Sequence, residues 1–460
     1  MRKASLRHAT LLSALCAAPV LALAAGPPED AASLTSAAPV SAAAAGALTW
    51  DQAARSALQH SPALAGAKQA VAAAEQGVAL ADADLMPSVD AVAGVNRSQS
   101  TALNSLSGPA GAASLSSGYS GGLQASWSLF SGFGGLYGRA RARQQLAGAK
   151  AQYAASSANL LLGLRQAFNQ LLYDQKNSAL LQAIADRYHQ DTRYQQLEFQ
   201  SGQTARWTFL KSQSDEAQVK WDLEQSKLNA QADRANLAAL LGQDPAQASE
   251  LAVAGELAAV APPADDSADW AKVQSGPAVQ QQQAALAADD AALGVSDASL
   301  YPSLNASGFY TYSGGDSWGP DKRVLGGSLN LDFNLFGGGA NLAAIRQARA
   351  TLEADRRALE NLLLTQRSGL RKAWASYLTA YDSVPVAQLA SAAGEERFKT
   401  VGALYSAGRA AYLDYEQAES IYTQSQQSEL SARLSAAQAQ AQYQNTLGLG
   451  LEDALATAAQ

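Results

Sequence analysis

The feature that most constrains this chain is an internal repeat that covers most of its length. Residues 62–100 align without gaps with residues 277–315 at an offset of 215, and residues 121–242 align with residues 327–448 at an offset of 206. Ungapped registers over more than 100 residues do not arise by chance, so the chain contains two copies of one structural unit. The first copy carries nine extra residues between its aligned blocks. They fall within 101–118, a Ser-, Gly- and Ala-rich segment that predicts a loop.

The repeat divides the chain into segments. The two copies are residues 48–242 and 276–448, with a connector at 243–275 between them and a C-terminal tail at 449–460. Residues 25–47 consist largely of Ala, Pro and Ser and predict a flexible linker. Ordered structure is expected to begin just after this linker, where a threonine can cap the first helix.

Each copy predicts the same order of elements: helix, strand, loop, strand, long helix, turn, helix. A long helix of about 65 residues spans about 100 Å at 1.5 Å per residue, so it must pack against partners along its length. The two shorter helices of each copy are together nearly as long, so they can stack end to end beside it. The helices are expected at 62–84, 135–200 and 204–241 in the first copy and at 277–299, 340–406 and 410–447 in the second.

The strands alternate apolar and polar residues over about ten positions, the length that crosses a bilayer at a tilt. A half-buried strand of a soluble protein alternates as well. The membrane interpretation is favoured because aromatic residues close the hairpins and a secretion signal precedes them. The residues predicted to face lipid are Leu123, Trp127 and Leu129 in the first copy and Leu329, Leu331, Phe333 and Leu335 in the second.

Four membrane strands cannot close a barrel, and open sheet edges are not tolerated in lipid. The chain is therefore expected to form a homotrimer with twelve strands. The fold class predicted is mixed α and β, with a membrane β-barrel continued by a long α-helical tunnel built from two internal repeats. The helices are rich in Ala and Gln with narrow Leu stripes, which suits a thin wall with water on both sides. A solid coiled-coil rod or stalk is the alternative, but it does not account for the strands.

The first 24 residues predict a signal peptide. Arg2, Lys3 and Arg7 precede an apolar stretch of about 14 residues, shorter than the ~20 that a spanning helix needs, and residues 22–24 offer a small-x-small cleavage site. Cys16 is the single cysteine, and lipidation there is a lesser alternative because a leucine, not a small residue, precedes it. Cleavage after residue 24 removes the cysteine and with it any disulfide.

Composition excludes several function classes. Without the basic residues of the signal, 30 basic and 40 acidic side chains remain, which argues against a nucleic acid partner. His60 and His189 lie far apart in the repeat, and no cysteine, metal-ligand cluster or catalytic triad accompanies them. Residues 337–339 are three glycines between a strand and a helix, but the Lys-Ser/Thr of a phosphate-binding loop is missing. We therefore expect no cofactor, no metal and no enzymatic activity.

A short motif occurs at the end of both long helices: an aromatic residue followed three positions later by glycine, at Phe199 and Gly202 and again at Tyr405 and Gly408. Together with the repeat, this resembles the TolC-type outer-membrane efflux proteins over almost all of the chain after the signal. The resemblance implies a trimeric outer-membrane channel that extends into the periplasm of a Gram-negative bacterium. It also implies export of drugs or type I secreted proteins, with a periplasmic adaptor (membrane fusion) protein and an inner-membrane transporter as partners.

The resemblance also assigns roles near the helix ends. The tips expected to contact the adaptor are Phe199, Gly202, Gln203 and Gly408. The family tends to carry an aspartate six residues after the glycine, which Asp414 matches in the second copy while Thr208 stands in the first. Three symmetry-related copies of Asp414 are expected to form a cation-selective constriction, with Thr208, Tyr405 and Arg409 as candidates for holding it shut. The alternative is that Asp414 is a solvated helix residue. This chain departs from the family at Ala410 and Gln417, where the best-known members have arginine and a second aspartate.

Overall fold

The computed structural model describes residues 47–100, 114–257, 262, 267–315 and 322–458. The predicted signal peptide and nearly all of the predicted linker lie outside these ranges. The first copy contains α1 (Trp50–His60), α2 (Pro62–Ala83), β1 (Ser88–Ser100), β2 (Ser114–Ser131), α3 (Gly134–Gln200) and α4 (Arg206–Leu240). The connector contains η1 (Pro245–Glu250) and α5 (Ser267–Gln274). The second copy contains α6 (Pro277–Ala298), β3 (Ser303–Gly314), β4 (Lys322–Asp332), α7 (Ala340–Ser406) and α8 (Tyr412–Thr446), and α9 (Leu451–Ala458) follows it.

The helices of the two copies are equal in length. α2 and α6 have 22 residues each, α3 and α7 have 67, and α4 and α8 have 35. Their bounds follow the two offsets read from the sequence, and the predicted bounds of all six helices agree within two residues. Pro62 and Pro277 occupy the first turns of α2 and α6, where the missing N–H costs nothing. Thr49 is the N-cap of α1, as predicted, and its backbone N–H donates to the Gln52 side chain at 3.0 Å.

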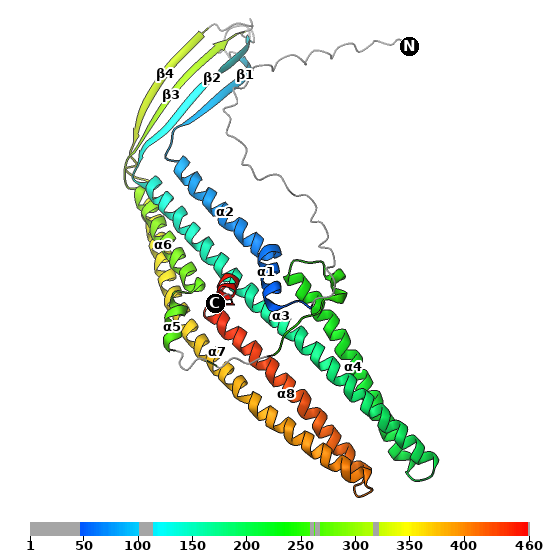
Figure 1. The fold of residues 1–460 in the computed structure, drawn as a ribbon. Helices are drawn as coiled ribbons and strands as arrows, with labels where there is room; N and C mark the ends of the chain where they lie inside the picture. The colour runs from blue at the N-terminus through cyan, green and yellow to red at the C-terminus, as the bar shows by residue number, and fades with distance from the viewer. Residues whose placement is uncertain (1–46, 101–113, 258–261, 263–266, 316–321, 459–460) are drawn as a thin grey trace, which may run out of the picture. The chain divides into compact units, whose positions relative to one another are not determined.

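Two shorter helices pack against each long one, as the lengths predicted. α2 and α4 contact α3, while α6 and α8 contact α7, and α3 also packs on α6 and α8 of the other copy (Figure 1). The ends of the stacked helices meet closely at two glycines that are equivalent in the repeat. A Cβ on Gly242 would lie 2.2 Å from the His60 carbonyl oxygen, and one on Gly448 would lie 2.5 Å from Pro277 Cδ. Each end-to-end joint therefore leaves no room for a side chain.

The four strands form one antiparallel sheet in the order β1-β2-β3-β4, so β1 and β4 are its edges (Figure 1). β2 is longer than predicted, with 18 residues, because it pairs with β1 along Ser114–Ser126 and with β3 along Tyr119–Ser131. Residues 114–118 were predicted as part of a loop, and this is wrong. A segment this rich in Ser, with a Gly, does not predict a strand, but its backbone completes the ladder with the end of β1. The rest of the predicted loop, 101–113, lies outside the described residues.

The main hydrophobic core surrounds the middle of α3. Leu164 and Leu171 are fully buried there, against α1, the end of α4 and Leu451 at the start of α9. Leu48 forms an isolated bridge with Val253 of the connector, which brings this linking segment back to the same core. α5 packs on α7 in a second, smaller cluster. The connector thus returns to the middle of the long helices, as expected, but the short helices α5 and α9 were not predicted.

Candidate functional site: two sheet faces and two helical tips

The sheet has one apolar face that extends across all four strands. Leu123 pairs with Ala91 on one side and Tyr310 on the other, and Ala306 pairs with both Trp127 and Leu329. Directly paired residues of antiparallel strands point to the same side. Their side chains therefore form a continuous surface, which is exposed at Leu123, Trp127, Leu325, Leu329 and Leu331. The apolar face contains Val89, Ala91, Ala93, Val95, Tyr119, Leu123, Ala125, Trp127, Leu304, Ala306, Tyr310, Leu325, Leu329 and Leu331.

The opposite face is mostly polar. Ser88 and Ser126 share a hydrogen bond of 2.8 Å between their Oγ atoms, and so do Ser307 and Ser328. Val92, Phe309 and Val324 interrupt this face. Its polar members include Ser88, Asp90, Asn96, Gln124, Ser126, Ser128, Asn305, Ser307, Thr311, Ser328 and Asn330. A sheet with one apolar and one polar face suits a boundary between hydrocarbon and water.

Three residues predicted to continue the apolar alternation do not. The β2–β3 register shifts between Ser128 and Phe130, so Leu129 is the extra residue of a bulge and Phe130 pairs with Leu304 in its place. Phe333 and Leu335 lie beyond β4, which ends at Asp332. The ladder stops there because the next residue of the partner strand is Pro302, which has no N–H to donate.

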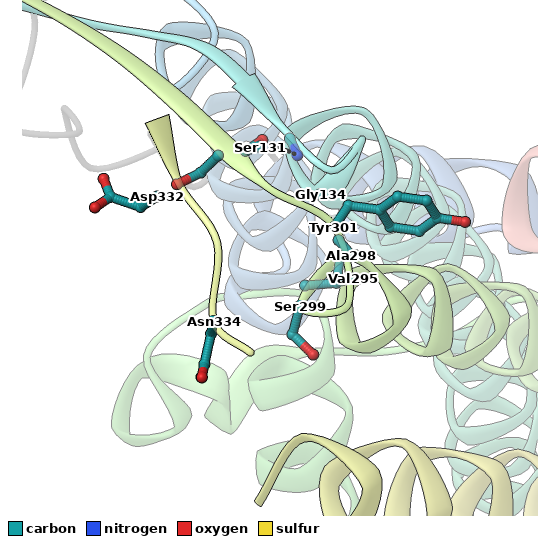
Figure 2. A pocket seen from close by; sticks show the side chains of 10 residues that line it. Ser131, Gly134, Val295, Ala298, Ser299, Tyr301, Asp332 and Asn334 are labelled. Atoms are coloured by element: carbon teal, nitrogen blue, oxygen red, sulfur yellow. Dashed lines mark hydrogen bonds between the residues drawn. The ribbon is translucent and has the colours of Figure 1, made fainter. Parts of the chain in front are cut away.

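An open hollow of about 510 Å³ lies where the sheet meets the helices (Figure 2). Asp332 and Asn334 lie on one side of it, and Ser299 and Tyr301 lie on the other. Its lining offers hydroxyls, one carboxylate and one amide. It holds no nucleophile paired with a base, so it does not support a catalytic role.

The two tips are built alike. Gly202 has φ +73° and Gly408 has φ +69°, a left-handed backbone conformation that favours glycine. At the first tip the Gly202 N–H donates to the Phe199 carbonyl at 3.1 Å and the Gln203 N–H donates to the Glu198 carbonyl at 2.8 Å. This is a Schellman motif, and the same pair of bonds recurs at Gly408 and at the residue after it. A Cβ at either glycine would meet nothing within 4 Å, so both tips are open to a partner.

The residues predicted for the constriction lie in different surroundings. Asp414 is exposed in the first turn of α8, where its Oδ2 accepts a 3.3 Å hydrogen bond from the Ala411 N–H. Arg409 is exposed at the tip, whereas Thr208 is 6% exposed in the first turn of α4. Tyr405 is half-buried, and its hydroxyl accepts from Gln195 Nε2 of α3 at 3.0 Å. Through this bond Tyr405 joins the second copy of the repeat to α3 of the first.

Sequence reasoning missed a buried charged cluster above the tips. Glu419 of α8 is 1% exposed, and Arg187 Nε of α3 donates to its Oε1 at 3.3 Å. Tyr415 of α8 donates to Asp191 Oδ2 of α3 at 3.3 Å. The signal in the sequence is an aromatic stripe with one acid at helical spacing: Tyr412, Tyr415, Glu419 and Tyr422.

The two histidines and the possible metal ligands were the remaining candidates for a catalytic or metal site in the described residues. His189 Nδ1 lies 2.8 Å from Glu216 Oε1, and His60 Nδ1 lies 3.2 Å from the Ser56 carbonyl oxygen, so each histidine has a local partner. Among the described residues no group of three or more His, Cys, Asp or Glu is placed to hold a metal ion. Within the same ranges no helix is long and apolar enough to cross a membrane.

Comparisons with known proteins identify the family to which the chain belongs. The sequence profile of a family described as outer membrane efflux protein matches residues 53–243 and 272–449. A search of curated proteins found no match. Among solved structures, the outer-membrane channel OprN has a TM-score of 0.75 at 20% identity, covering 87% of this chain and 90% of its own. The CmeC outer membrane channel of Campylobacter jejuni has a TM-score of 0.76 at 16% identity, covering 89% and 88%.

The open state of the MtrE outer membrane channel of Neisseria gonorrhoeae is similar as well, with a TM-score of 0.75 at 21% identity, covering 88% of this chain and 89% of that one. At such identities the solved structures show a shared fold, while the profile match to most of the chain shows the family. The chain therefore belongs to the outer membrane efflux protein family: it is an efflux channel protein of the Gram-negative outer membrane that extends into the periplasm, and it is not an enzyme.

Proposed function

We propose that three copies of this chain assemble into a twelve-stranded barrel continued by a periplasmic helical tunnel. The observation that supports this is the pair of open sheet edges, β1 and β4, on a sheet with one apolar face. An open edge in hydrocarbon leaves backbone groups unsatisfied at a cost of several kcal/mol each, and pairing β4 of one copy with β1 of the next removes that cost. In this arrangement Leu123, Trp127, Leu329 and Leu331 face lipid.

The trimer would act as a passive exit duct for drugs and other small molecules or for type I secreted proteins. It would receive them from an inner-membrane transporter through a periplasmic adaptor protein, which contacts the tips at Phe199, Gly202, Gln203 and Gly408. These tips are exposed and lie at the far ends of α3 and α7 from the sheet. A structural rod or stalk, the alternative considered from the sequence, would not conduct ions, so ion conduction is the property that tests the duct.

The entrance of the duct would be narrowed by a ring of three Asp414 carboxylates near the threefold axis. Like charges at a constriction repel one another and attract cations. The first copy of the repeat supplies only Thr208 at the equivalent place, so the ring would hold three charges. Tyr405, which binds α3 through Gln195, and Arg409 at the tip are proposed to keep the entrance closed.

Purified protein in planar lipid bilayers is expected to form cation-selective channels that multivalent cations block. Asp414→Asn should weaken both the selectivity and the block, because it removes the charge and keeps a side chain that can cap α8. Asp186→Asn, an exposed charge on α3 well above the tip, is the matched control and should leave both unchanged. A protein that does not conduct contradicts the duct. Unchanged selectivity in Asp414→Asn would show that Asp414 does not line the constriction and only caps α8.

A further inference from the structure

Each edge strand of the sheet carries one arginine on the apolar face. On β1 the apolar alternation ends at Val95, and the next residue on that face is Arg97. On β4 the alternation begins at Leu325, and the preceding residue on that face is Arg323. β1 runs away from the helices and β4 runs back toward them (Figure 1), so both arginines lie in the half of their strand that is farther from the helices. Both side chains are exposed.

Two tyrosines lie on the same face between the arginines. Tyr119 of β2 pairs with Val95, and Tyr312 of β3 pairs with Arg323. The Tyr312 ring extends over Gly121 of β2, where a Cβ would overlap it, so the ring points away from β4. In membrane barrels, aromatic belts mark the boundary between hydrocarbon and lipid headgroups. The arginines at the end of the apolar face are therefore placed at headgroup level.

No acidic residue of the described strands shares the face of the arginines. Asp90 of β1 and Asp332 of β4 both belong to the polar face, on the other side of the sheet. The positive charges of Arg97 and Arg323 are thus not neutralised from within this part of the sheet. A partner for them must come from outside it, and opposite charge favours an anion.

The strand register shows that the two arginines are level in a tilted sheet. Arg323 aligns with Ala93 of β1 through the pairs that cross β3 and β2, and Arg97 lies four residues farther along β1. β4 and β1 are three strand steps apart. The offsets are about 13 Å along the strands and about 14 Å across them, at about 3.3 Å per residue and about 4.8 Å per strand. A tilt of about 43° makes these offsets cancel, and barrel strands tilt by about 35–45°.

The apolar face gives the direction of the tilt. Arg97 lies eight residues from Val89, the first apolar-face residue of β1, and Arg323 lies eight residues from Leu331, the last one of β4. The apolar run is therefore equally long on both edge strands, and it is displaced between them by the same four residues. Apolar residues that lie level in the bilayer require the tilt that brings the two arginines to one height.

Closure of the barrel brings Arg323 beside Arg97 of the next copy, because β4 of one copy then pairs with β1 of the next. Both sheets keep their apolar faces outward, so the register between them can change only in steps of two residues. Arginines at one height are then either directly opposite or on the adjacent diagonal, with Cβ atoms about 5–8 Å apart. Two guanidinium groups this close repel each other unless an anion lies between them.

We propose that Arg323 of one copy and Arg97 of the next form a binding site for the phosphate groups of a lipid in the outer leaflet of the outer membrane. Guanidinium groups bind phosphate through paired N–H donors. The apolar face below the arginines contacts the acyl chains of the same lipid. The site rests on the proposed function, because one chain alone does not complete it, and a trimer has three such sites.

Native mass spectrometry of the purified trimer with lipid A, a glycolipid that carries two phosphates, tests the site. The wild-type trimer should retain up to three lipid A molecules more tightly than any further ones, and rising ionic strength should weaken their binding. Dephosphorylated lipid A should bind weakly. Inorganic phosphate at the concentration of the lipid should not displace lipid A, because it lacks acyl chains. Displacement by inorganic phosphate would mean a site for the free ion and would overturn the proposal.

Arg97→Gln and Arg323→Gln should each weaken the binding of lipid A by about fivefold, and together by roughly 25-fold. Lys322→Gln is the matched control, because Lys322 is exposed beside Arg323 but belongs to the polar face, and it should bind lipid A as the wild type does. The double variant should also lose the dependence on ionic strength.

Three results would overturn the site: wild-type binding in the double variant, an equal loss in Lys322→Gln, or six equally tight lipid A molecules per trimer. Wild-type binding of lipid A that does not change with ionic strength would overturn it as well, and this measurement needs no variant. A conducting trimer that gives any of these results leaves the duct standing and removes only the lipid site. Wild-type protein that is monomeric would contradict the trimer itself.

Discussion

Leu329→Arg is expected to destabilise the membrane-embedded protein by about 2–4 kcal/mol per copy, while Ser328→Arg should cost much less. Leu329 lies on the apolar face of β4, opposite Ala306, and Ser328 points to the polar face beside Ser307. A lipid-facing arginine must be desolvated near the middle of the bilayer, whereas an arginine on the inner face stays in water. Leu331 is a weaker site for this test, because it lies one residue from the end of the strand.

The measurement is the free energy of unfolding in denaturant for protein refolded into lipid vesicles, supported by the yield of folded protein in outer-membrane fractions. Three copies per trimer multiply the effect, so the Leu329 variant should be nearly absent from the membrane. Equal losses for the two variants would show that the apolar face of the sheet does not face lipid.

Gly408→Pro is expected to abolish export while leaving the assembled protein in the outer membrane. Proline fixes φ near −65°, whereas Gly408 has φ +69°, and proline also lacks the N–H that donates to the Tyr405 carbonyl at 2.9 Å. The turn between α7 and α8 must therefore rearrange, and with it the surface proposed to contact the adaptor. Gly408→Ala is the control, because it keeps the N–H, meets open space and costs about 1–2 kcal/mol.

Export is measured by drug sensitivity and by secreted protein in cells that depend on this chain. Cysteines at Gln203 and Arg409 should crosslink to the adaptor in the same cells. Labelling of these cysteines only from outside the cell would mean that the tips lie on the wrong side of the membrane. Normal export by the Gly408→Pro variant would show that the turn at Gly408 is not needed for export.

The six helices of the repeat could be predicted because two independent constraints agree on them. The repeat fixes equivalent bounds in both copies, and Pro62, Pro277, Gly202 and Gly408 mark ends whose backbone requirements are local. The short helices could not. α9 has eight residues and is held by Leu451, which is fully buried and whose N–H donates to Ser157 Oγ at 3.0 Å. A helix this short depends on such tertiary contacts more than on its own sequence.

In the sheet and in the buried cluster, too, local sequence predicts some features while tertiary contacts determine others. Alternation predicted the apolar face correctly at Leu123, Trp127, Leu329 and Leu331, but the bulge at Leu129 depends on how β2 meets β3. The buried contacts of Arg187 with Glu419 and of Tyr415 with Asp191 depend on the register of α3 against α8, which the aromatic stripe of α8 alone does not give. The repeat gives no help there, because the position equivalent to Glu419 in the first copy is Gln213.

Disulfide crosslinking of the two sheet edges shows whether β1 of one copy pairs with β4 of the next. One cysteine at Ala93 of β1 is combined in turn with cysteines at positions 324–330 of β4, and the protein is oxidised in native outer membranes. Ser126 and Ser307, paired within one chain on β2 and β3, provide the intrachain control. If β1 of one copy pairs with β4 of the next, some β4 positions should give covalent species of up to three chains. Monomers at every position, with the control pair crosslinked within its own chain, would contradict this pairing.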